Sequence, residues 1–144
     1  MGGTSVAQKV GPLFGAVFIV LGIIGFLITG FDDGFTAVTG HELLGMGLNA
    51  FHNLAYILAG VFLIILCLKG PPAAAEGATI GIGLFLVVLF ILGVMSDDNL
   101  TIIGMTGEGD TGNFLHLIVG VTLLAIGLLS SGATAAQAKK QGLA

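Results

Sequence analysis

Charged side chains are scarce in this chain of 144 residues, of which 8% are charged and 56% are apolar. A soluble domain carries about a quarter charged residues, so the composition excludes an ordinary water-soluble domain. Arginine and tryptophan are absent, and the net charge is -4. Because the chain has no basic patch to neutralise phosphates, we expect no nucleic-acid partner.

Cysteine occurs once, at Cys67, so the chain forms no internal disulfide. The short motifs of common enzyme classes are also missing from the sequence: it contains no G-x-S-x-G, no P-loop, no H-E-x-x-H and no C-x-x-C. We therefore expect a protein that is not an enzyme.

Long apolar runs occupy most of the chain. A membrane-spanning helix needs about 20 largely apolar residues. Four runs without Lys, Arg, Asp or Glu meet this requirement, at approximately 11–30, 44–68, 77–95 and 112–132. The sequence predicts a single all-α domain over residues 1–144, an integral membrane bundle of four transmembrane helices.

The few charges are sorted between alternate connections of these runs. Counting four crossings puts every lysine on one side of the membrane: Lys9, Lys69, Lys139 and Lys140. It puts all the acids except Glu76 on the other side: Asp32, Asp33, Glu42, Asp97, Asp98, Glu108 and Asp110. Lysines near short loops are retained on the cytoplasmic side, so the pattern predicts that both termini are cytoplasmic.

Glycine is abundant, with 25 residues. The first run carries four glycines on roughly one stripe, and the fourth run carries two that are seven positions apart. These are Gly11, Gly15, Gly22 and Gly25, and then Gly120 and Gly127. Small residues let helix backbones approach closely in lipid, so we predict packing seams inside the bundle.

The two halves of the chain share a layout. Each predicted hairpin has an acidic pair in its outer loop, at 32–33 or 97–98, and then an Asn-x-x-His motif, at 49–52 or 113–116. Both hairpins start on the inner side, which predicts a parallel repeat about an axis along the membrane normal. Aligning the two motifs makes Asn49 equivalent to Asn113 and His52 equivalent to His116.

Polar residues gather on one face of the second and fourth helices. Their spacings are i, i+3, i+4 and i+7 in one helix and i, i+3 in the other. They are Asn49, His52, Asn53 and Tyr56, and then Asn113 and His116. At a rise of 1.5 Å per residue, His52 is expected about 12 Å below the outer start of its helix and His116 about 6 Å. Such side chains avoid lipid, so we predict that this polar cluster converges in the outer half of the bundle.

Three roles are open for the polar cluster. Hydrogen bonds between helices explain it without any ligand. Alternatively, His52 and His116 bind a cofactor, as ligands of a haem iron or of a copper or zinc ion, although a closed metal site usually takes four ligands. A transport path is the third role, and the expected lack of ionisable side chains in the inner halves of the helices argues against it.

Several stretches resemble the bacterial domain-of-unknown-function 4383 family. They are Leu13-Phe14-Gly15-Ala16-Val17-Phe18, Gly25-Phe26, Leu43-Leu44-Gly45, His52-Asn53-Leu54 and Asn113-Phe114-Leu115-His116-Leu117. The resemblance covers 11–129 and implies a small four-helix protein of the plasma membrane, with no established activity. The second helix of that family typically reads Leu-His-Asn-Leu-Val-His, whereas Tyr56 stands here at the last position. This departure weakens the case for metal ligation by the second helix.

Taken together, these patterns favour a multi-pass protein of the bacterial plasma membrane that is a non-enzymatic structural or accessory subunit of a membrane complex. Its expected partners are the lipid bilayer and other membrane-protein subunits. The alternative is a haem- or metal-binding membrane protein that uses His52 and His116, and a small transporter is the third hypothesis.

The predicted topology can be tested by cysteine accessibility. A cysteine introduced within residues 106–108 is expected to react with a membrane-impermeant thiol reagent added from outside the cytoplasm, because this loop lies opposite the lysines. Labelling only from the cytoplasmic side would invert the assigned orientation.

Overall fold

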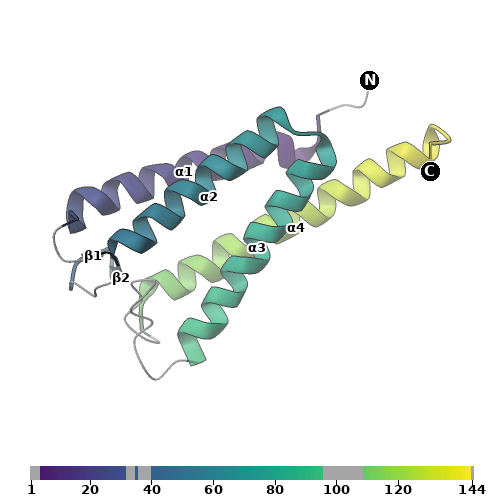
Figure 1. The fold of residues 1–144 in the computed structure, drawn as a ribbon. Helices are drawn as coiled ribbons and strands as arrows, with labels where there is room; N and C mark the ends of the chain where they lie inside the picture. The colour runs from purple at the N-terminus through teal and green to yellow at the C-terminus, as the bar shows by residue number, and fades with distance from the viewer. Residues whose placement is uncertain (1–3, 32–34, 36–39, 96–108, 144) are drawn as a thin grey trace.

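The computed structural model is an all-α protein whose four helices are each long and apolar enough to cross a membrane. It describes residues 4–31, 35, 40–95 and 109–143. The helices are α1 (Val6–Thr29), α2 (Ala50–Lys69), α3 (Pro72–Met95) and α4 (Thr111–Lys140). The predicted multi-pass architecture is therefore confirmed. Both termini lie at the same end of the molecule as the α2–α3 connection (Figure 1).

The helices associate as two hairpins, with α1 packed along α2 and α3 packed along α4 (Figure 1). Contacts between the two hairpins are far fewer than contacts within each of them. At the end away from the termini, the short strands β1 (Glu42–Leu43) and β2 (Met46–Gly47) pair antiparallel. Their turn is Leu44-Gly45, and both residues have positive φ, as a two-residue type I′ turn requires.

The observed helix limits differ from the sequence-based limits for local reasons. The first helix starts at Val6, before the expected 11, because Ser5 and Gln8 form a capping box. The second starts at Ala50 rather than at 44, because residues 42–47 form the strand pair and Asn49 supplies the N-cap. The third starts at Pro72, a residue well suited to a first helical turn, and the fourth continues to Lys140.

Two expectations about depth are wrong as a result. His52 is the third residue of α2 and so lies within its first turn, not two turns below its start. Glu76, expected in the connecting segment, lies inside α3 and is buried. Its Oε1 accepts hydrogen bonds from Ser130 Oγ (3.2 Å) and Thr134 Oγ1 (2.7 Å). The half of the bundle nearer the termini therefore does contain an ionisable side chain.

The predicted glycine seams are confirmed. All four glycines of the α1 stripe are buried and face α2, and a Cβ added to Gly15 would lie 2.7 Å from the carbonyl oxygen of Gly60. On the other hairpin, a Cβ added to Gly83 would lie 2.5 Å from the backbone nitrogen of Leu124, and one added to Gly120 would lie 2.9 Å from the carbonyl oxygen of Gly83. The two helices of each hairpin are therefore in direct backbone-to-backbone contact.

The same seams show that the two hairpins are repeats and fix their register. The Gly15–Gly60 crossing of the first hairpin corresponds to the Gly83–Gly120 crossing of the second. Buried positions of α2 and α4 then match in pairs: Asn53 with Asn113, Tyr56 with His116, Gly60 with Gly120, Leu63 with Leu123, and Cys67 with Gly127. Those of α1 and α3 match as Ala7 with Ala75, Gly15 with Gly83, Phe18 with Leu86, and Gly25 with Gly93.

The sequence-based alignment of the repeat was therefore wrong by one helical turn. It equated Asn49 with Asn113, whereas the structure equates Asn53 with Asn113 and Tyr56 with His116. The physical reason is that the helix crossings set the register, whereas Asn49 is an N-cap outside α2.

The glycine seam between α3 and α4 can be tested with two single alanine substitutions on α3. Gly83→Ala is expected to lower the free energy of unfolding by about 1–3 kcal/mol, because the new methyl group overlaps the backbone of α4. Gly81→Ala is the matched control: apart from its chain neighbours and the backbone of its own helix, no atom lies within 4 Å of the added Cβ, and alanine is the better helix former. Unfolding in micelles measures both, and equal effects would contradict backbone contact at Gly83.

Candidate functional site

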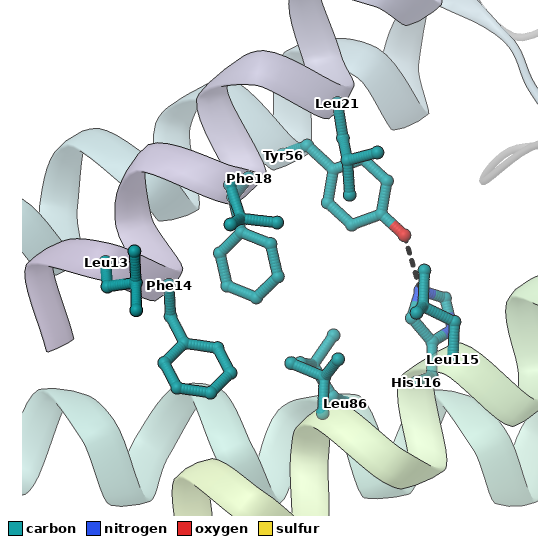
Figure 2. A pocket seen from close by; sticks show the side chains of 10 residues that line it. Leu13, Phe14, Phe18, Leu21, Tyr56, Leu86, Leu115 and His116 are labelled. Carbon is teal, nitrogen blue, oxygen red and sulfur yellow. Dashed lines mark hydrogen bonds between the residues drawn. The ribbon is translucent and has the colours of Figure 1, made fainter. Parts of the chain in front are cut away.

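Three members of the predicted polar cluster converge between the hairpins. His52 and Tyr56 come from α2, and His116 comes from α4. The ring centroids of the two histidines are 5.8 Å apart, and those of His52 and Tyr56 are 4.5 Å apart. The hydroxyl of Tyr56 lies 3.3 Å from Nε2 of His116 (Figure 2). The predicted convergence of the two histidines is therefore confirmed.

These three residues, the central triad, are nearly sealed from the surface. His52 and Tyr56 are each 5% exposed and His116 is 3% exposed. The Tyr56 hydroxyl also lies 3.6 Å from Sδ of Met46, on strand β2. Among the described residues, however, Nδ1 of His52 and Nδ1 of His116 have no hydrogen-bond partner. Buried polar atoms are usually paired, so these two nitrogens require an explanation.

A residue that sequence reasoning missed, Asp110, anchors the end of the site that lies away from the termini. It is 3% exposed and is the N-cap of α4. Its Oδ1 accepts a hydrogen bond from Gly112 N (2.7 Å) and its Oδ2 accepts one from Gly47 N (3.0 Å). A carboxylate is favoured at a helix N-terminus by the helix dipole. The available signal was an Asp directly before the fourth apolar run, which is the pattern of an N-cap.

The asparagines of the predicted cluster do not join the triad. The side chain of Asn49 caps α2 by accepting a hydrogen bond from His52 N (2.7 Å). Asn53 enters the seam with α1, where Nδ2 donates to Thr29 Oγ1 (2.9 Å) and the amide fills the space beside Gly25. Asn113 is fully buried on the face of α4 that carries His116. Interhelical hydrogen bonding thus accounts for Asn53, but not for the histidine Nδ1 atoms.

Two cavities of about 160 Å³ each flank the triad. The α1–α4 cavity is lined mainly by α1 and α4, and the α2–α3 cavity mainly by α2 and α3. Both are bounded by Phe18, Tyr56, Leu86 and His116. Figure 2 shows Phe14, Phe18 and Leu86 around one opening, with the Tyr56 hydroxyl directed at His116 beside it.

The two cavities are copies of each other under the repeat. Their equivalent lining residues are Phe14 and Ile82, Val17 and Phe85, Leu21 and Leu89, Leu115 and Ala55, and Val119 and Ala59. The principal difference is His52, which lines the α2–α3 cavity, whereas its equivalent on α4 is Gly112. The site is therefore a pair of equivalent apolar cavities, of which one has an additional histidine in its lining.

Both cavities open sideways rather than toward the ends of the bundle. Leu13 and Val17 line the α1–α4 cavity and are 66% and 47% exposed, and Phe85 lines the α2–α3 cavity and is 60% exposed. In a spanning bundle these side chains face the hydrocarbon region. Access to the cavities therefore runs from the lipid.

Haem or metal ligation by His52 and His116 stays a prediction. Nε2 of His116 faces the Tyr56 hydroxyl, so Nδ1 is the ring nitrogen without a partner. Within the described part of the chain, no group of three or more His, Cys, Asp and Glu side chains is placed to hold a metal ion. A metal here would therefore take only the two imidazoles from these residue types, short of a closed four-ligand site.

Substitution of Asp110 tests whether its side chain holds the amides of Gly47 and Gly112. Asp110→Ala is expected to lower the free energy of unfolding by about 1–3 kcal/mol, because α4 loses its cap and the Gly47 amide loses its acceptor. Amide hydrogen exchange should accelerate at both Gly47 and Gly112. Asp110→Asn, which keeps one acceptor oxygen, should leave one of these amides protected. Unchanged exchange at both amides in Asp110→Ala would contradict this role.

Comparison with known proteins identifies the family to which the chain belongs. The family model for a domain of unknown function, DUF4383, matches residues 8–129. No match was found among curated proteins or among solved structures. The matched region covers most of the chain and includes the triad and both cavities. The four-helix chain therefore belongs to the DUF4383 family of domains of unknown function.

Proposed function

We propose that this protein is a non-enzymatic accessory protein of the bacterial plasma membrane that binds a lipid-soluble, ring-sized molecule beside its central triad. The observation that carries the proposal is the pair of equivalent cavities, each bounded by apolar walls and by Tyr56 and His116. A binding pocket is typically lined mostly by apolar groups, and both cavities are lined almost entirely by apolar atoms.

The size of the cavities supports a ring-sized guest. An engineered cavity of about 150 Å³ lined by Leu, Ile and Phe stays dry and binds benzene. Each cavity here has about 160 Å³. The apolar walls are Leu, Val and Phe in the α1–α4 cavity and Leu, Ile, Phe and Ala in the α2–α3 cavity. One six-membered ring fills such a space, and a hydrocarbon tail can leave through the lateral opening into the lipid.

An accessory role fits the surroundings of this site. The triad lies in the first two turns of α2 and α4. These helices begin at the end of the bundle away from the termini (Figure 1), which by the lysine pattern is the non-cytoplasmic side. Large apolar side chains are exposed along all four helices and offer surface to lipid and to neighbouring subunits, for example Leu27, Phe62, Phe85 and Ile118. A ligand held at the triad would be presented within that surface.

The proposal is tested by ¹⁹F NMR of fluorobenzene added to the protein in lipid nanodiscs. A saturable bound signal is expected, with empty nanodiscs as the reference for partition into lipid. Val119→Phe should remove binding in the α1–α4 cavity, and Ala59→Phe should remove binding in the α2–α3 cavity, because each fills equivalent space in one copy. The two single variants act as controls for one another.

The double variant combining Val119→Phe and Ala59→Phe should lose the bound signal while remaining folded by circular dichroism. A signal that persists in this double variant, or the absence of any signal beyond the empty-nanodisc reference for the unmodified protein, would reject the cavities as binding sites.

A further inference from the structure

Aromatic side chains are distributed unequally between the two cavities. The linings share three rings, those of Phe18, Tyr56 and His116. The α1–α4 cavity adds the ring of Phe14, and its other lining side chains are Leu and Val. The α2–α3 cavity instead adds three rings, those of Phe51, His52 and Phe85. The cavities are therefore equivalent in position but different in chemistry.

Two of the added rings lie where the other half of the repeat has a side chain that is not aromatic. Phe85 on α3 corresponds to Val17 on α1, and both are exposed at a cavity mouth. Phe51 on α2 corresponds to Thr111 on α4, which does not line the α1–α4 cavity. The α2–α3 cavity therefore carries two phenyl rings that have no aromatic counterpart at the equivalent positions.

The ring of Phe51 is held in place by Phe35, which precedes the strand pair. The backbone N–H of Phe51 donates to the carbonyl oxygen of Phe35 (2.9 Å). The two phenyl rings pack edge to face, with centroids 5.9 Å apart and planes at 87°. A ring that is already fixed in this way loses little further freedom when a guest packs against it.

The inner wall of the same cavity is also built of packed rings. The rings of Phe18 and Tyr56 are stacked, with centroids 5.7 Å apart and planes at 10°. The ring of His52 lies 4.5 Å from that of Tyr56 and is tilted by 44°. The cavity lining is almost wholly apolar, so a guest meets the carbon atoms of these rings.

We propose that the α2–α3 cavity selects a flat aromatic ring over a saturated ring of similar size, and that Phe51 and Phe85 determine this preference. Aromatic rings attract one another edge to face or offset-stacked, beyond the burial of area, because the ring face is negative and the ring edge positive. A saturated ring lacks this charge distribution and gains only from area burial. The inference rests on the proposed function and names the ligand class of one cavity, a lipid-soluble aromatic compound.

The same argument gives the α1–α4 cavity a weaker preference. Among the described residues, Phe14 is the single ring that this cavity adds to the shared ones, and Val17 stands where the other cavity has Phe85. Aromatic and saturated rings are therefore expected to bind there with similar affinity. Each chain then carries one site that selects aromatic rings and one that does not.

The experiment measures the displacement of fluorobenzene by unlabelled guests, using ¹⁹F NMR of the protein in lipid nanodiscs. Benzene is compared with cyclopentane and cyclohexane, which bracket it in volume, and concentrations are expressed per volume of lipid. In Val119→Phe, which leaves the α2–α3 cavity open, benzene is expected to bind about fivefold more tightly than either saturated ring. In Ala59→Phe, which leaves the α1–α4 cavity open, the preference is expected to be about twofold or less.

Exchange of the equivalent mouth residues assigns the preference to a side chain. Phe85→Val, made together with Val119→Phe, should lower the preference for benzene in the α2–α3 cavity to about half or less. Val17→Phe, made together with Ala59→Phe, should raise the preference in the α1–α4 cavity about twofold or more. Continued binding of cyclohexane shows that the cavity of each variant is still open.

Phe51 and a control ring complete the set of variants. Phe51→Leu, made together with Val119→Phe, should also lower the preference for benzene. Phe62 is an exposed ring on α2 that lines neither of the two cavities. Phe62→Leu in the same background should therefore leave the preference unchanged.

The outcomes separate the two proposals. Equal affinity of benzene and both saturated rings for the α2–α3 cavity would overturn the aromatic preference and leave ring binding intact. A preference that survives both Phe85→Val and Phe51→Leu would overturn the role given to these residues. Failure of fluorobenzene itself to give a saturable bound signal would instead reject the proposed function.

Discussion

The fold depends on two places where helix backbones touch. In lipid there is little hydrophobic force between helices, so association relies on close van der Waals packing and on hydrogen bonds. At Gly15 and Gly60, and again at Gly83 and Gly120, the missing side chains let carbonyl oxygens approach the opposite helix. Each hairpin is consequently a tight unit, and the larger side chains of both hairpins are left to fill the space between them. They fill it incompletely, which produces the two cavities.

The repeat explains why there are two cavities, and its imperfection explains why they need not do the same thing. Equivalent walls come from equivalent positions of α1 and α3 and of α2 and α4. Near the axis, however, Tyr56 replaces the equivalent of His116, and His52 stands where the other half has Gly112. The hydroxyl of Tyr56 meets His116 across the interface between the hairpins, so the two halves are joined by a pair of unlike residues. A symmetric scaffold thus carries an asymmetric polar centre.

Much of this architecture could be predicted from sequence, because the relevant signals are local. The apolar runs predicted the four spanning helices, and the glycine stripe predicted the face by which α1 packs in the bundle. The convergence of His52 and His116 followed from helix periodicity and the avoidance of lipid. What could not be predicted depends on tertiary contacts. The strand pair at 42–47, the buried carboxylates of Asp110 and Glu76, and the register between Asn53 and Asn113 all depend on which elements meet. The cavities depend on volumes left between helices and have no sequence signal.

The central claim is that two equivalent, ring-sized apolar cavities lie between the closely packed hairpins, on either side of the Tyr56–His116 contact. The most direct measurement is a crystal structure of the protein under xenon pressure, because a small apolar cavity takes up xenon without needing a polar contact. Two xenon sites related by the repeat are predicted, one beside Val119 and one beside Ala59. The absence of xenon from both positions would contradict this account.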